Sequence, residues 1–267
     1  MNRLICFLFA LTVCLISIPT FAVTASVNIQ NFLFSPNVLT INLGDSVKWL
    51  NKDDITHSIT QDSNLWTHDA NPGSSFTRQF NTEGSYSYHC RFHPSMTGKV
   101  VVRNAEQTRI KIGQDIVTVP PKVLPITLNL KGKIANTVYL GSYIVNAQSG
   151  CANCHSCPTY AVGHNPYKKE VKQFNARTYL AGGVSIKGVV SANLTPDKTG
   201  KPAGLTLAQF KTLLRTGHDP DVPGQLLPVM PWPFFGMMSD HDLDAIYSYL
   251  SSIPKAVTPT KACVLGQ

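Results

Sequence analysis

The chain has 267 residues, which is enough for two modest domains and too long for one small module. Its 23 Lys and Arg residues outnumber its 15 Asp and Glu residues, and the formal net charge of +8 favours a protein partner with an acidic docking surface. The basic residues do not form runs and no nucleic-acid-binding motif occurs, so a nucleic-acid partner is not expected.

The first residues have the composition of a secretory signal peptide. Arg3 supplies a positive charge, an apolar run extends from Leu4 to Ile18, and the small residue Ala22 stands at the end. We expect a signal peptide at residues 1–22, cleaved after Ala22 in preference to Ala25. The apolar run is shorter than the roughly 20 residues that span a bilayer, although an uncleaved anchor is the alternative. The mature protein is therefore expected to be periplasmic, free or peripheral to the membrane, without a stable membrane span.

Residues 23–103 have the pattern of short β-strands. Val27 and Ile29 alternate with polar residues, as do Val47 and Trp49, and turn-forming Gly, Asp and Glu residues separate such runs. Short strands with frequent turns predict a small antiparallel β-sandwich.

A metal-ligand set lies near the end of this region. Cys90, His93 and Met96 stand within seven residues, and a thiolate, imidazoles and a weak axial thioether are the ligands of blue copper. The second imidazole is expected from an earlier strand, where His57 is the preferred candidate. His68 is the rival, but its neighbours are typical of an exposed loop. His89 directly precedes the cysteine on a strand and should point to the opposite face.

Each of these residues also has an ordinary interpretation. A single buried Cys is usually a packing residue, and a lone His is usually a surface group. The combination of Cys, His and Met at these offsets, with an upstream His, favours a copper site.

Residues 104–132 differ in character from the segments on either side. Val119-Pro120-Pro121 and Leu124-Pro125 favour extended backbone and oppose a helix. This predicts an inter-domain linker, with an ordered arm packed on one domain as the alternative.

From residue 133 to 267 the periodicity becomes helical. A first helical segment contains the apolar residues Val138, Ile144 and Val145. A second helix is expected after the N-cap Thr206 and a third after the N-cap Ser239. The last helix should present Leu243, Ile246, Tyr247 and Leu250 on one face and end before Pro254.

This second region contains the motif Cys151-Ala152-Asn153-Cys154-His155, the attachment sequence of a c-type haem. Cys151 and Cys154 would form the two thioether bonds, and His155 would be one axial ligand of the iron. Met230, in a proline-rich loop, is the preferred second axial ligand over Met237 and Met238. A zinc knuckle or a redox dithiol is the alternative interpretation of the motif.

The remaining cysteines have less specific roles. Cys6 and Cys14 lie in the expected signal peptide, which leaves Cys157 and Cys263. In an oxidising compartment these two could pair as a disulfide or remain two unrelated thiols.

The first region resembles the cupredoxins, in particular amicyanin and plastocyanin. The likeness is carried by Phe34–Trp49, by His57 and by Tyr88–Val101. It implies an all-β Greek-key sandwich in which His57, Cys90, His93 and Met96 bind one type 1 copper ion. It also implies that His93 opens on an apolar surface through which electrons leave. Ser58 stands where these families commonly have Asn, a departure that concerns the tuning of the site and not the ligation.

The second region is similar to class I-like c-type cytochromes, most of all to cytochrome subunits of membrane-associated alcohol and aldehyde dehydrogenases. The likeness is carried by Gly150–His155, Asn193–Asp197, Leu214–Gly217 and Met230–Trp232. It implies an all-α domain with one covalently bound haem c, held by His155 and Met230, whereas those subunits usually hold three haems.

The expected protein thus has two domains, an all-β Greek-key cupredoxin sandwich and an all-α cytochrome c domain. We expect an electron carrier and not an enzyme, which relays single electrons between copper and haem and on to a redox partner. The alternative is an electron-transfer subunit of a dehydrogenase, reductase or terminal oxidase complex. A dinuclear copper site would need a second Cys near Cys90, and a copper nitrite reductase would need further histidines; the sequence shows neither. A copper carrier is a further alternative, although a blue-copper site retains its metal.

Overall fold

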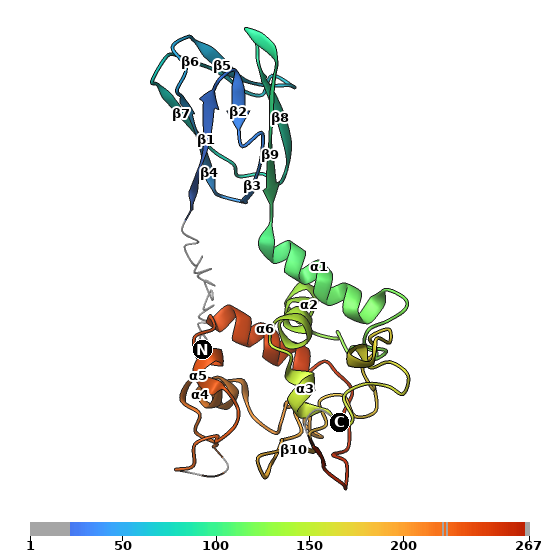
Figure 1. The fold of residues 1–267 in the computed structure, drawn as a ribbon. Helices are drawn as coiled ribbons and strands as arrows, with labels where there is room; N and C mark the ends of the chain where they lie inside the picture. The colour runs from blue at the N-terminus through green and yellow to red at the C-terminus, as the bar shows by residue number, and fades with distance from the viewer. Residues whose placement is uncertain (1–21, 221, 223, 265–267) are drawn as a thin grey trace, which may run out of the picture. The chain divides into compact units, whose positions relative to one another are not determined.

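A computed structural model of the chain describes residues 22–220, 222 and 224–264. The predicted signal peptide, apart from Ala22, lies outside the described residues. Within the described part, the helices are all too short or too polar to cross a membrane. The chain divides after Asn104 into two compact units, each of which is described by itself (Figure 1).

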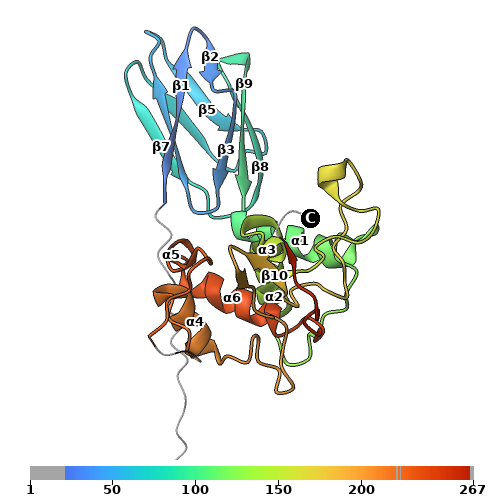
Figure 2. The same cartoon turned by 60° about the horizontal axis from the view of Figure 1, so that its bottom comes forward.

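The first unit is a sandwich of two β-sheets (Figures 1 and 2). Its strands are β1 (Thr24–Gln30), β2 (Leu33–Ser35), β3 (Val38–Asn42), β4 (Ser46–Asn51), β5 (His57–Gln61), β6 (Thr67–Ala70), β7 (Ser75–Gln79), β8 (Gly84–Cys90) and β9 (His93–Arg103). One sheet has the order β2-β1-β4-β7 and the other the order β3-β9-β8-β5-β6. The predicted sandwich is confirmed, but the prediction that it is antiparallel is wrong in two places, because β1 pairs in parallel with β4 and β3 with β9.

The core of this unit follows from the alternation in the sequence. Val27, Ile29, Val47 and Trp49 are all fully buried, because successive residues of a strand point to opposite faces and these four face the other sheet. The Trp49 ring lies among other aromatic rings of the sandwich, those of Trp66, Phe76, Phe80 and Tyr88.

The second unit is mainly helical. Its helices are α1 (Ala105–Thr118), α2 (Ala135–Tyr143), a π-helix (Ile144–Gln148), α3 (Cys151–His155), a 3₁₀ helix (Pro166–Lys168), α4 (Leu207–Thr216), α5 (Trp232–Phe235) and α6 (Asp240–Leu250). The expected caps are present: the Thr206 side chain accepts a hydrogen bond from Gln209 N, and the Ser239 side chain accepts one from Asp242 N. On α4, Phe210 and Leu214 are buried.

The predicted linker at 104–132 is wrong. Its first half is helix α1, and Ile110 and Val117 of this helix are buried in the core of the second unit together with Leu124 of the extended segment that follows. The prolines at 120 and 121 follow the last residue of the helix, Thr118. A proline restricts the residues just before it, so these two end the helix but do not prevent one further upstream. Only Asn104 stands between β9 and α1.

The second unit is also not purely α-helical, which corrects the fold class expected for it. Strand β10 (Val184–Ile186) pairs antiparallel with β11 (Val189–Val190) and parallel with β12 (Cys263–Val264). Cys263 of β12 forms a disulfide with Cys157, so one of the two alternatives left open for these residues holds. Strands of two or three residues are too short to produce a periodic pattern in the sequence.

Two glycines allow helices of this unit to approach each other closely. A Cβ atom on Gly113 of α1 would lie 1.8 Å from the Tyr139 carbonyl oxygen of α2. A Cβ atom on Gly141 of α2 would lie 1.9 Å from the Ala245 carbonyl oxygen of α6. Both contacts are to backbone, which has little room to move. Helices α1, α2 and α6 thus form the packed centre of the unit.

Candidate metal and haem sites

The β8–β9 hairpin brings two of the predicted copper ligands together. Cys90 ends β8, His93 begins β9, and the two are cross-strand partners on either side of the turn formed by Arg91 and Phe92. The Sγ atom of Cys90 lies 3.6 Å from Nδ1 of His93. A two-residue turn holds facing side chains close, so the sequence spacing is converted directly into a pair of ligands.

His57 completes a cluster with these two residues. It is the first residue of β5, fully buried, and its Nδ1 atom lies 3.7 Å from the Cys90 Sγ atom. The ligand atoms of His57, Cys90 and His93 all lie within 4.8 Å of one another, and Cys90 is a free thiol. Two imidazole nitrogens and one sulfur in this arrangement suit a copper ion in a near-trigonal plane.

The other candidates from the sequence lie as follows. Met96 is on β9, buried to 1% exposure, in the same apolar cluster as Cys90. His68 is not in the ligand cluster; its ring stacks on Phe76 at 4.3 Å between centroids. His89 is also outside it, with Nδ1 2.8 Å from the Asp62 carboxylate.

Ser58, which departs from the pattern of the cupredoxins, links the two strands that carry ligands. Its backbone N–H donates to Cys90 Sγ at 3.2 Å. Its hydroxyl oxygen accepts a hydrogen bond from Arg91 N at 2.8 Å and lies 3.1 Å from the Thr60 hydroxyl. A serine can therefore fix the loop after Cys90 at this position. Contacts of this kind orient metal ligands and adjust the properties of the bound metal.

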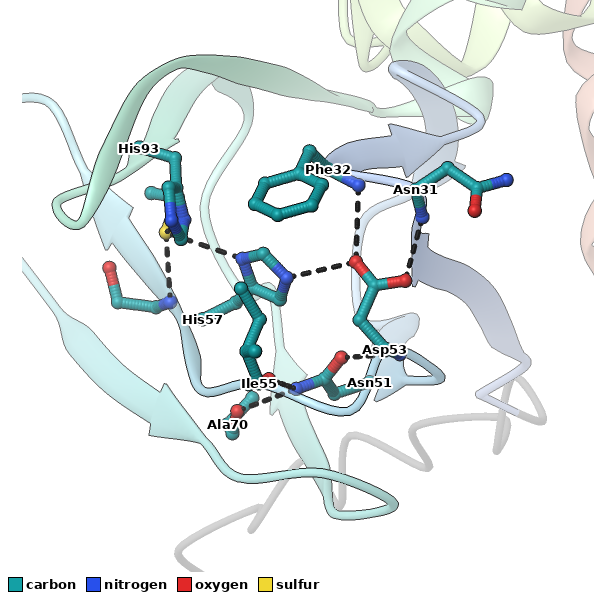
Figure 3. A network of polar contacts seen from close by, with 10 residues as sticks. Asn31, Phe32, Asn51, Asp53, Ile55, His57, Ala70 and His93 are labelled. Carbon is teal, nitrogen blue, oxygen red and sulfur yellow. Dashed lines mark hydrogen bonds and ion pairs between the residues drawn. The ribbon is translucent and has the colours of Figure 1, made fainter.

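His57 is held from its other side by Asp53 (Figure 3). The Nε2 atom of His57 lies 2.9 Å from Oδ2 of Asp53, and the backbone N–H groups of Asn31 and Phe32 donate to the same carboxylate at 2.7 and 3.1 Å. Burial acts to raise the pKa of Asp53, but the hydrogen bonds from Phe32, Asn31 and His57 outweigh it and the pKa lies below its usual value. An ionised carboxylate only accepts hydrogen bonds, so Nε2 of His57 carries the proton and Nδ1 is left to bind a metal.

Aromatic side chains surround the two imidazoles. The Phe32 ring meets the ring of His57 edge-on at 5.5 Å and that of His93 at 4.9 Å between centroids. Phe32 and Phe92 are both about half exposed, at 50% and 46%. The side chain of Arg91 lies over the Phe92 ring and forms an ion pair with Asp69. The His93 edge of the cluster thus adjoins exposed apolar side chains.

In the second unit the predicted haem-attachment sequence forms helix α3. Cys151 and Cys154 are free thiols one helical turn apart. Nδ1 of His155 donates to the Ala192 carbonyl oxygen at 2.8 Å, because a carbonyl can only accept. This leaves Nε2 of His155 as the nitrogen available to an iron, and a backbone carbonyl on the far nitrogen is the usual support of a metal-binding histidine.

Burial shifts the pKa values of the three side chains of this motif. It raises the pKa of the Cys151 thiol to about 12 and also raises the pKa of Cys154. It lowers the pKa of His155, against the opposing effect of the bond to Ala192. Both thiols and the imidazole are therefore neutral at pH 7, which is consistent with an apolar surrounding for a haem.

The three candidate methionines differ in their surroundings. Met230 is partly buried and packs against the same apolar core as Cys151. Met238 also packs there, whereas Met237 is 77% exposed. The donor set of the motif and the apolar core beside it fit a covalently bound haem, and Met230 remains the predicted distal ligand.

Two features beside the candidate copper site do not follow from the sequence pattern. The sequence pattern singles out neither Asp53 nor the Asn31-Phe32 turn. The spacing of four residues between Asp53 and His57 is not distinctive by itself. The two side chains meet only because the irregular loop between β4 and β5 brings them together. Asn in a turn was the one available signal, since Asn tolerates positive φ.

Comparison with known proteins agrees with this geometry. The family described as "Cupredoxin-like domain" matches residues 4–102. Amicyanin of Paracoccus versutus is 34% identical over 91 residues, which cover 32% of this chain and 67% of amicyanin. Chloroplastic plastocyanin of Tetradesmus obliquus is 36% identical over 85 residues, 27% of this chain and 59% of that protein. Through its first unit the chain belongs to the cupredoxin family.

A relative of another kind is also similar. The cytochrome subunit of fructose dehydrogenase from Gluconobacter japonicus is 36% identical over 83 residues, which are 30% of this chain. They are only 17% of that subunit, so the chain spans a small part of this relative's length. The chain therefore combines a cupredoxin domain with similarity to cytochrome subunits of dehydrogenases.

Proposed function

We propose that the protein is an exported electron carrier, with one type 1 copper in its first unit and one covalent haem c in its second. The observation that carries the proposal is the cluster of His57, Cys90 and His93. Met96, which is buried in the same apolar cluster as Cys90, would add the axial thioether. Copper would supply a Cu(I)/Cu(II) couple and haem an Fe(II)/Fe(III) couple. No residue of the chain is proposed to act on a substrate, so a catalytic partner would be a separate chain.

The haem half of the proposal rests on α3 and its surroundings. Cys151 and Cys154 provide the thioether bonds, and His155 provides one axial nitrogen. The Ala192 carbonyl fixes the ring of His155, since it engages the other nitrogen at 2.8 Å. A His and Met pair of axial ligands gives a haem of relatively high potential, which suits exchange with copper.

A second role is favoured by a separate observation, the similarity to the fructose dehydrogenase cytochrome subunit. In this role the chain accepts electrons from a dehydrogenase subunit and passes them on. The net charge of +8 suits an acidic docking surface on such a partner.

Reduction of the purified protein by a quinone-dependent dehydrogenase and its substrate, with a rate that falls as salt is added, would support this role. A rate that does not depend on salt would contradict docking through charge.

The copper site can be tested with one substitution. The oxidised protein is expected to show the intense visible band of a copper–thiolate bond, and Cys90→Ser should abolish it because serine cannot provide the thiolate. The haem spectrum should remain unchanged in the same sample and serves as the internal control. A visible copper band that persists in Cys90→Ser would contradict the assignment.

A further inference from the structure

Asp53 makes more contacts around the candidate copper site than a lone surface carboxylate would. Its side chain is 11% exposed, beside a His57 side chain that is fully buried. One carboxylate accepts from three donors: His57 Nε2, Asn31 N and Phe32 N. Figure 3 shows these contacts converging on the two oxygens.

The turn bound by Asp53 has an unfavourable backbone conformation. Asn31 has φ of 53° and Phe32 has φ of 58°, in the left-handed region that a bulky residue such as Phe rarely adopts. Such a conformation persists only where surrounding contacts enforce it. The two hydrogen bonds from this turn to Asp53 are contacts of this kind. Their consequence is that the Phe32 ring lies against both imidazoles of the ligand cluster.

Asp53 is itself held in place by a buried amide. The Asn51 side chain accepts from Asp53 N at 3.0 Å, and it donates to the carbonyl oxygens of Ile55 and Ala70 at 2.8 Å each. Asn51 is buried to 1% exposure. The loop between β4 and β5 is therefore tied at both ends, and the carboxylate has a fixed position relative to His57.

We propose that Asp53 is a positioning residue for the proposed copper centre, which orients His57 and, through the Asn31-Phe32 turn, places the Phe32 ring edge-on against the rings of His57 and His93. The inference rests on the proposed function, because it assigns a role in holding the copper. Asp53 does not bind the metal in this arrangement. It acts through the Nε2 atom of His57, on the side of the ring away from Cys90.

Two substitutions at Asp53 test the proposal in the full chain. Asp53→Asn keeps the shape but leaves one acceptor oxygen for three donors, and Asp53→Ala removes both acceptors. Each should weaken Cu(II) binding about 10-fold to 100-fold in a titration, the range found when such supports of metal ligands are removed. Each should also change the copper hyperfine splitting in the electron paramagnetic resonance spectrum. Phe32→Leu, which leaves the carboxylate intact, should change the splitting with little loss of affinity.

The matched control is Asp62→Asn. Asp62 also pairs with a histidine of the same domain, His89 at 2.8 Å, but that histidine is outside the ligand cluster. This variant should keep the affinity and the spectrum of the unmodified protein. An equal loss in Asp62→Asn, or unchanged copper binding and splitting in both Asp53 variants, would overturn the proposal.

A measurement without copper separates this proposal from the proposed function. In the copper-free protein the Nε2–H of His57 should give an exchange-protected NMR resonance, which disappears in Asp53→Ala. If the unmodified protein binds no copper but shows this difference, the proposed function fails while the positioning of His57 stands. If the resonance is equally protected in Asp53→Ala, the positioning role is wrong whatever the protein binds.

Discussion

Met230 is the predicted distal ligand of the haem iron, and this assignment depends on how its surroundings differ from those of two other methionines. Three methionines lie near the end of the chain, and the sequence alone ranks them only by loop context. Met230 and Met238 are partly buried against the core of the second unit, and Met237 is exposed. Burial therefore argues against Met237 but does not by itself separate the other two.

Substitution can separate them. Met230→Ala should lower the haem reduction potential and open a coordination position to added ligands, because a thioether favours ferrous iron. Potentiometry and the binding of carbon monoxide to the reduced protein measure both effects. Met237→Ala should leave both unchanged and is the control. If Met238→Ala, and not Met230→Ala, lowers the potential, the distal ligand is Met238.

At the scale of elements, the crossing of α2 and α6 depends on Gly141. A glycine inside a helix costs about 1 kcal/mol relative to alanine, so its presence here has a packing reason. The carbonyl oxygen of Ala245 would lie 1.9 Å from a Cβ atom at this position, which is far inside van der Waals contact. The two backbones can be this close only while position 141 has no side chain.

Gly141→Ala should therefore destabilise the second unit, although alanine is the better helix former. Forcing α2 and α6 apart is expected to cost about 3 kcal/mol. Denaturant unfolding, followed by far-ultraviolet circular dichroism, measures the free energy of unfolding of this unit, because the described helices all lie in it. Asn136→Ala, at an exposed position of the same helix, is the control and should be neutral or slightly stabilising. Equal stability of both variants would show that the helices separate without cost.

The disulfide between Cys157 and Cys263 joins β12 to the segment that follows the haem-attachment motif. The two residues are 106 positions apart, and closing a long loop restricts the unfolded chain. It also removes a third thiol from the neighbourhood of Cys151 and Cys154. Pairing of Cys157 with either of these would compete with haem attachment.

The double variant Cys157→Ser, Cys263→Ser is expected to lower the free energy of unfolding of the second unit by about 2–4 kcal/mol. A thiol reductant should destabilise the unmodified protein by a similar amount and leave the double variant unaffected. The single variant Cys263→Ser should in addition yield less protein with covalent haem, measured as haem staining after denaturation. Full haem content in this variant would show that the extra thiol does not compete.

On the scale of the whole molecule, the connection between the units determines how electrons would pass. The sequence predicted an inter-domain linker at residues 104–132, but only Asn104 separates β9 from α1. Two modules on one chain meet at an effective concentration that their connection sets and that dilution of the protein does not change. Exchange between copper and haem is then expected within one molecule, without an encounter between two.

Rapid photochemical reduction of the haem would test this expectation. The copper–thiolate band should then bleach at a rate that stays constant when the protein is diluted, since an intramolecular step is first order. Cys90→Ser, which lacks the band, shows which absorbance changes belong to the haem. A rate that rises in proportion to protein concentration would mean that the two units exchange electrons only with other molecules.

Much of the organisation was determined by the sequence itself, because it depends on neighbours in the chain. Val27 and Ile29 alternate with polar residues, as do Val47 and Trp49, and this alternation defines the buried faces of two strands. The spacing of Cys90 and His93 becomes a pair of ligand atoms because a hairpin turn lies between them. The attachment motif is likewise contained in one helical turn, and the caps of α4 and α6 involve residues three positions apart.

Only the tertiary structure decided the features that depend on distant residues. Asp53 contacts the Asn31-Phe32 turn because parallel pairing of β1 with β4 places these segments together. Helix α1 exists in a proline-flanked segment because the second unit buries Ile110 and Val117. Strand β12 likewise pairs with the distant β10, and its disulfide joins residues 106 positions apart. Local periodicity carries no information about such contacts, since their stability comes from packing between elements and not from the propensity of either segment.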